Sequence, residues 1–102
     1  MPFAMKRYPF TRPVLDYAPY DIGGVYVLWE GDEVIYIGRT GGSRNIRSCL
    51  LEHLEGTRGG CTTRATHYSW EITLWDSARE TELLALFAKE NSRDPRCQQG
   101  AG

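Results

Sequence analysis

Residues 24–38 read GVYVLWEGDEVIYIG, two short apolar runs separated by a Gly-Asp pair at positions 31–32. Both runs are rich in β-branched and aromatic residues, which favour strands, and a Gly-Asp pair between such runs is typical of a hairpin turn. We therefore expect two neighbouring antiparallel strands, with Tyr26 on the first and Tyr36 on the second.

A helix is predicted after this hairpin. Apolar residues lie at helical spacing over residues 46–53, and Ser43 or Asn45 is a candidate N-cap residue. Gly56 is predicted to end the helix. The following segment, residues 56–66, contains two adjacent glycines and is expected to be a loop.

One more strand and one more helix follow. Residues 68–74 alternate apolar and polar side chains, which predicts a half-buried strand. A second helix is expected to open at Ser77, with Glu80 completing a capping box. The order hairpin, helix, strand, helix predicts a small α+β domain, a three-stranded antiparallel sheet flanked by helices.

The 102 residues are enough for one domain with a modest core. We expect a lead-in without clear periodicity over residues 1–22, a folded domain over 23–98 and a tail over 99–102. No apolar run is long enough to span a bilayer, so no membrane association is expected. The first 13 residues lack the apolar centre of a signal peptide, and a cytoplasmic location is expected.

The three cysteines, Cys49, Cys61 and Cys97, are odd in number and widely spaced. They form no CxxC pair and have no clustered histidines beside them, which argues against a structural zinc site. Reduced thiols are therefore expected.

The formal net charge of −1 argues against strong nonspecific affinity for nucleic acid. The arginines are nevertheless concentrated between positions 39 and 64, where few acidic residues oppose them, and a local basic face is expected there.

The tripeptides Gly24-Val25-Tyr26 and Tyr36-Ile37-Gly38, with their ten-residue step between tyrosines, resemble the GIY-YIG nuclease domain. The resemblance covers about residues 23–98. It implies hydrolysis of DNA phosphodiester bonds with one divalent ion, Mg²⁺ or Mn²⁺. It also implies catalytic roles for Tyr26 and Tyr36, with Tyr26 orienting or activating the water.

The resemblance extends to the helix but breaks at one position. His53 matches the family's helix histidine, whereas Cys49 stands where the family has an arginine. Arg47 cannot replace it, since two residues apart on a helix means about 200° of rotation. Either Arg39 or Arg44 reaches in from the loop, or the domain has lost much of its catalytic power. Losing one such charge donor can cost on the order of 10²–10³ in rate.

The remaining site residues implied by the resemblance lie near the end of the chain. Glu80 is the candidate metal ligand, with Glu82 as the alternative, and Gln98 stands in place of a family asparagine. The candidate catalytic residues are Tyr26, Tyr36, Arg39, His53 and Glu80, and the candidate nucleic-acid-binding residues are Arg39, Arg44, Arg47 and Gln98.

Three functions follow from these observations. The first is a metal-dependent DNA endonuclease. The second is a catalytically weak or inactive module of the same fold that binds DNA or a protein, which the cysteine at position 49 favours. The third is a housekeeping α+β domain in which Tyr26 and Tyr36 have only a structural role. The substrate stays open among branched DNA, damaged duplex, a short site and RNA. Targeting would come from loops, the N-terminal segment, a homodimer or a protein partner.

Overall fold

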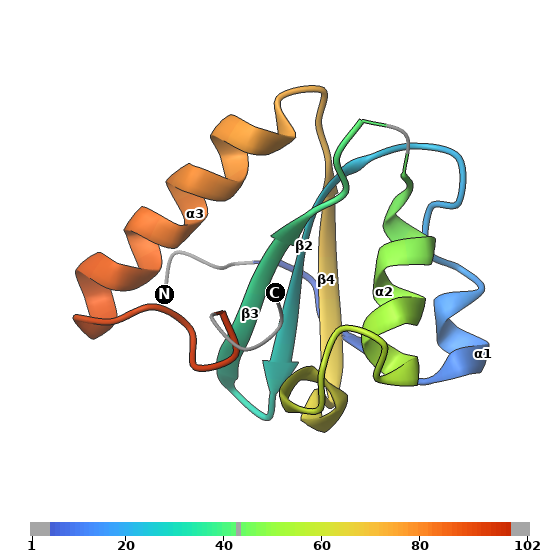
Figure 1. Ribbon diagram of the computed structural model, residues 1–102, viewed down its shortest axis with the longest axis horizontal. Coiled ribbons are helices and arrows are strands. Elements are labelled where there is room, and N and C mark those ends of the chain that lie inside the picture. The colour runs from blue at the N-terminus through green and yellow to red at the C-terminus, as the bar shows by residue number, and fades with distance from the viewer. Residues whose placement is uncertain (1–4, 43, 99–102) are drawn as a thin grey trace.

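The computed structural model describes residues 5–42 and 44–98, which form a four-stranded antiparallel sheet with helices on both faces (Figure 1). The predicted α+β class is confirmed, with one strand more than expected. The strand order is β1-β4-β2-β3. The elements are β1 (Tyr8–Pro9), α1 (Arg12–Leu15), β2 (Gly24–Glu30), β3 (Glu33–Arg39), α2 (Ile46–Glu55), the 3-10 helix η1 (Cys61–Arg64), β4 (His67–Ile72) and α3 (Asp76–Asn91).

The predicted hairpin is formed by β2 and β3. Gly31 adopts a positive φ of 61° in the turn, a conformation that glycine tolerates readily. Tyr26 lies opposite Gly38, and Leu28 lies opposite Tyr36. Because paired residues and residues two apart share a face of a sheet, both tyrosines point to the same side.

The sheet is covered on both faces. Helices α1 and α2 pack on one face and α3 on the other (Figure 1). On the first face Tyr26 and Leu28 pack in a buried cluster with Leu50 of α2. On the second face Val27 packs with Leu83 and other apolar residues of α3 and β3. Within the described ranges, no helix is long and apolar enough to cross a membrane.

The fourth strand comes from the segment expected to be an irregular lead-in. Tyr8 of β1 pairs with Tyr68 of β4, and Phe10, Leu15 and Ala18 are buried in the same core as the hairpin. Elements of two and four residues are too short to produce a visible hydrophobic period, so the sequence pattern did not reveal them.

The ends of α2 are as predicted. The side chain of Asn45 accepts a hydrogen bond from the backbone N–H of Ser48, and Ser48 bonds back to Asn45, which forms a capping box. Gly56 ends the helix in the left-handed conformation. The other candidate cap, Ser43, lies outside the described residues.

The capping box predicted for α3 is wrong. The helix begins at Asp76, one residue before Ser77, and its N-cap is Trp75, whose side chain makes no capping bond. Instead, Asp76 Oδ2 accepts a hydrogen bond from the backbone N–H of Gly41, 3.0 Å away. Because Ser77 is not the N-cap residue, Glu80 does not complete a capping box with it.

A disulfide joins Cys61 of η1 to Cys97 in the C-terminal segment, so the expectation of reduced thiols is wrong for these two residues. Cys49 is free and buried, as expected. The two bonded cysteines are 36 positions apart, and only the fold brings them together.

The C-terminal segment lies along β3. The backbone N–H of Cys97 donates to the carbonyl of Ile35, at 2.9 Å. The amide of Gln98 accepts from the N–H of Ile37 at 3.0 Å and donates to its carbonyl at 2.7 Å. Gln98 is thus engaged by the backbone of the residue that follows Tyr36.

We predict that breaking the disulfide destabilises the fold. A cross-link closing a loop of this length stabilises by about 3–4 kcal/mol on the chain-entropy account. Urea unfolding of wild type with and without dithiothreitol should show this loss. A Cys61→Ser/Cys97→Ser variant should be as stable as the reduced wild type, and dithiothreitol should not change its stability. Equal stability of the oxidised and reduced forms would contradict the prediction.

Candidate active site

A polar cavity of about 620 Å³ lies where β3, α2 and α3 meet. Because β3 is an edge strand, side chains from helices on opposite faces of the sheet reach the same cavity. Its charged and aromatic wall consists of Tyr36, Arg39, Arg44, Glu52, Arg58 and Glu80.

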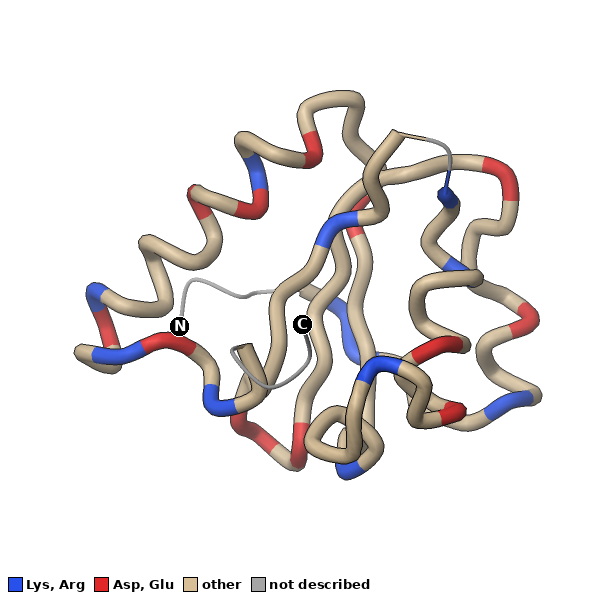
Figure 2. The backbone as a smooth tube through the Cα atoms, in the orientation of Figure 1, with Lys and Arg blue, Asp and Glu red and all other residues tan. Residues whose placement is uncertain are grey.

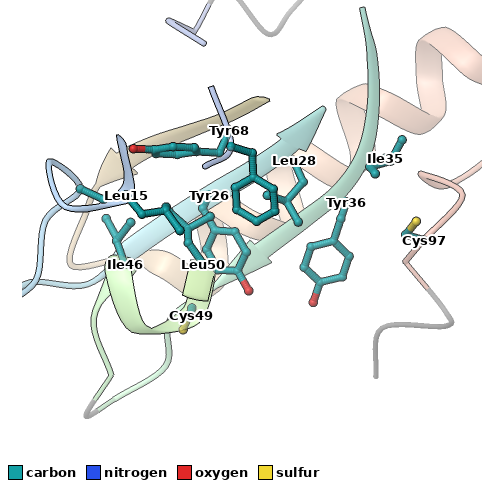
Figure 3. Close-up of a cluster of buried hydrophobic side chains, with 12 residues drawn as sticks. Leu15, Tyr26, Leu28, Ile35, Tyr36, Ile46, Cys49, Leu50, Tyr68 and Cys97 are labelled. Carbon is teal, nitrogen blue, oxygen red and sulfur yellow. The ribbon is translucent and has the colours of Figure 1, made fainter. Parts of the chain in front are cut away.

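The two motif tyrosines lie side by side but differ in access to the cavity. Both rings point toward the side of the sheet where Cys49 lies on α2 (Figure 3), with ring centroids 6.1 Å apart. Tyr26 is fully buried, whereas Tyr36 is 7% exposed and lines the cavity. Tyr36, rather than Tyr26, is therefore the tyrosine that a bound molecule would meet.

Gly38 makes this arrangement possible. A Cβ atom at this position would lie 2.6 Å from the hydroxyl oxygen of Tyr26 and 2.8 Å from Cε2 of Tyr36. Both distances are shorter than any non-bonded contact of carbon allows. The glycine that ends the second motif tripeptide is thus required by the packing of both tyrosines.

His53 fixes the position of the buried tyrosine. Its Nε2 lies 2.9 Å from the hydroxyl of Tyr26, and its Nδ1 lies 2.9 Å from Oγ1 of Thr62. The imidazole centroid is 4.7 Å from that of the Tyr36 ring. Thr62 belongs to η1, and its role could not be predicted because it lies in the segment expected to be a loop.

The three aromatic groups are uncharged at neutral pH. Burial, followed by the nearby charge of Arg58, lowers the pKa of His53 to about 4. Burial also raises the pKa of Tyr26 and of Tyr36 above the usual range. The tyrosines and the histidine therefore act as a neutral hydrogen-bonding group, with Tyr36 as its member at the cavity wall.

Three arginines reach the cavity from different segments. Arg39 lies between two carboxylates of α3, with Nη1 3.7 Å from Asp76 Oδ2 and Nε 3.6 Å from Glu80 Oε1. Arg44 forms an ion pair with Glu52. Arg58 Nη1 lies 3.4 Å from the other carboxylate oxygen of Glu52.

Arg47 points away from the cavity, as its place on the helix predicted. Its Nε donates to the carbonyl of Ala18 at 3.3 Å, and its guanidinium lies over the ring of Tyr20. Lysines and arginines are interspersed with acidic residues along the chain (Figure 2). Of the candidate phosphate-binding arginines, Arg39 and Arg44 line the cavity, where each is paired with a carboxylate.

The two candidate metal ligands are placed differently. Glu80 lines the cavity and is 25% exposed, and burial raises its pKa while the charge of Arg39 opposes that shift. Glu82 is 60% exposed and pairs with Arg79 outside the cavity. The structure therefore brings Glu80, and not Glu82, to the other site residues.

The cavity contains few side chains that could ligate a metal ion, and Glu80 is the carboxylate among them that the resemblance implicates. Among the residues that the structure describes, no three histidine, cysteine or carboxylate side chains gather into a metal-binding group. Mg²⁺ binds through one or two carboxylates, with water and substrate phosphate completing its shell. A single carboxylate, Glu80, fits that mode of binding.

Comparison with protein-family models finds no match to this chain, and comparison with curated proteins finds none either. The assignment of a function therefore depends on the motif residues and on the geometry of this cavity.

We predict that Gly38→Ala disrupts the site. The added methyl group forces the two tyrosines apart, and overpacking of this kind costs about 1–3 kcal/mol. Gly60→Ala is the matched control, since a Cβ there meets nothing within 4 Å. Urea unfolding and the near-ultraviolet circular dichroism of the tyrosines report the change. If Gly38→Ala and Gly60→Ala changed the stability and the circular dichroism equally, the close contact at Gly38 would not limit the residue at that position.

We also predict a pH dependence of stability that originates at His53. Since the pKa of His53 is about 4 when folded and near 6.5 when unfolded, the unfolded chain binds more protons between these values. Stability should fall as the pH is lowered from 6.5 to 4, by at most about 1.4 kcal/mol per pH unit. Unfolding measured at several pH values should show a shallower slope for His53→Gln. An unchanged slope would assign the effect to other groups.

Proposed function

We propose that this chain is a metal-dependent endonuclease of the GIY-YIG type that hydrolyses phosphodiester bonds in DNA. The observation that carries the proposal is the cavity, where motif residue Tyr36, three arginines and Glu80 meet. Arginines bind phosphate through fork-like pairs of N–H donors, and a carboxylate in the same space suits a divalent ion.

In the proposed reaction a water oxygen bonds to phosphorus while the bond to one sugar oxygen breaks. The water proton leaves to solvent, and a proton from solvent completes the departing hydroxyl. The hydroxyl of Tyr36 holds the attacking water or a phosphoryl oxygen by a hydrogen bond. Tyr26 and His53 act behind it, because their hydrogen bond and ring contacts fix the orientation of the Tyr36 ring.

Positive charge in the cavity stabilises the phosphoryl group as its negative charge increases. Arg39 lies closest to Glu80 and can neutralise either that carboxylate or a phosphate oxygen. A Mg²⁺ or Mn²⁺ ion bound at Glu80 would supply further stabilisation of the phosphoryl and leaving oxygens.

A second function, binding of DNA or a protein without catalysis, is favoured by Cys49. This residue is buried in the cavity wall, and burial raises its pKa, so it offers a neutral thiol where the family resemblance implies a guanidinium. In either case a homodimer or a protein partner could provide targeting. A cytoplasmic location belongs to the proposal, although the Cys61–Cys97 disulfide would be uncommon there.

The test is cleavage of plasmid, single-stranded and branched DNA, and of RNA, by the purified protein in Mg²⁺ or Mn²⁺. We expect cutting that requires the metal and falls on the order of 10²–10³ in Glu80→Gln. Glu82→Gln decides between the two carboxylates, and only slight loss is expected from its exposed position.

The outcomes separate the two candidate functions. Absence of cutting on every substrate in both metals would reject the endonuclease. Retained DNA binding in that case would support the non-catalytic module. Equal cutting by wild type and Glu80→Gln would instead point to a contaminating nuclease.

A further inference from the structure

The cavity contains a guanidinium that the motif does not explain. Arg58 follows the end of α2 at Gly56, and its side chain lines the cavity together with Tyr36 and Cys49. It is 27% exposed, so it is partly withdrawn from solvent while still open to the cavity. None of the motif positions predicts an arginine at this place in the chain.

The contact that Arg58 makes leaves it able to bind an anion. Its Nη1 is 3.4 Å from Glu52, a longer separation than a strong charge-assisted hydrogen bond. Arg44 is the closer partner of Glu52, and its hydrogen bond holds the pKa of that carboxyl below the usual range. A guanidinium has five N–H donors, and the contact with Glu52 involves one of its nitrogens.

The charge of Arg58 also acts on the aromatic group. Burial raises the pKa of Tyr36, and the charge of Arg58 is the largest influence opposing that shift. The same charge adds to burial in lowering the pKa of His53. Arg58 and Tyr36 line the same cavity, so the guanidinium charge faces the space in which the proposed phosphate would bind.

The turn that carries Arg58 is held in place. The backbone N–H of Thr57 donates to the carbonyl of Glu52 at 3.0 Å, and that of Gly59 donates to Gly56 at 3.2 Å. Three residues after Arg58, Cys61 is linked to Cys97. A charged group on such a fixed turn can be preorganised for its ligand, as electrostatic catalysis requires.

We propose that Arg58 is a phosphate-binding arginine of this site, and that it provides from the turn after α2 the guanidinium that Cys49 cannot provide from within the helix. Cys49 and Arg58 line the same cavity, so a guanidinium from the turn can face the space beside the thiol. This inference rests on the proposed nuclease function for its catalytic consequence, but phosphate binding by Arg58 can be tested without cleavage.

The experiment compares Arg58→Gln, Arg58→Lys and wild type, with Arg12→Gln as the matched control. Arg12 also pairs with a glutamate of α2, Glu55, but it is outside the cavity. Cleavage is measured on a substrate that wild type cuts, and binding of inorganic phosphate is followed by NMR. Thermal unfolding establishes that each variant is folded.

We expect Arg58→Gln to lower the cleavage rate on the order of 10²–10³. Phosphate binding should weaken by about tenfold, the effect of one charge-assisted hydrogen bond. Arg58→Lys keeps the charge but loses the fork of N–H donors, so it should retain part of the cleavage rate and part of the affinity for phosphate. Arg12→Gln should leave both unchanged.

The inference would be overturned if Arg58→Gln cut DNA and bound phosphate as well as wild type does. If wild type cuts no substrate, the nuclease proposal fails, and the phosphate titration alone then decides the role of Arg58. Loss of phosphate binding in Arg58→Gln would uphold that role, whereas undetectable phosphate binding by wild type would reject it.

Discussion

The arrangement of the site depends on the contact between Gly38 and the two tyrosine rings. Without a side chain at Gly38, the ring of Tyr26 packs directly over β3 and its hydroxyl meets Nε2 of His53. This hydrogen bond links the sheet to α2 inside the protein, and Thr62 extends the link to η1. The hairpin, the helix and the following turn therefore hold one another in place around Tyr36.

This link explains why the cavity collects residues from separate parts of the chain. Tyr36 and Arg39 come from β3, Glu52 from α2 and Glu80 from α3. Because β3 is at the edge of the described sheet, no further strand separates the helices on its two faces there. Side chains from both helical layers can therefore line the same cavity. The paired arginines and carboxylates make the lining of this cavity mainly polar.

The hairpin and α2 could be predicted from sequence because their signals are local. Turn chemistry, β-branched runs and the Asn45 cap are each set within a few residues. The disulfide and the place of Arg58 could not be predicted in this way, since both depend on where the chain goes after Gly56. Glu80 was predicted as a site residue, but its competing capping role was excluded only when α3 proved to begin at Asp76.

The C-terminal segment has one more consequence, which concerns the open edge of the sheet. Exposed N–H and carbonyl groups on an edge strand are a template for pairing with another chain and for aggregation. Here Gln98 occupies both backbone groups of Ile37, and Cys97 occupies the carbonyl of Ile35. At the opposite edge, β1 is two residues long and contains Pro9. The C-terminal segment thus covers part of the β3 edge, and the strand at the other edge is too short and too interrupted by proline to offer a long template for pairing.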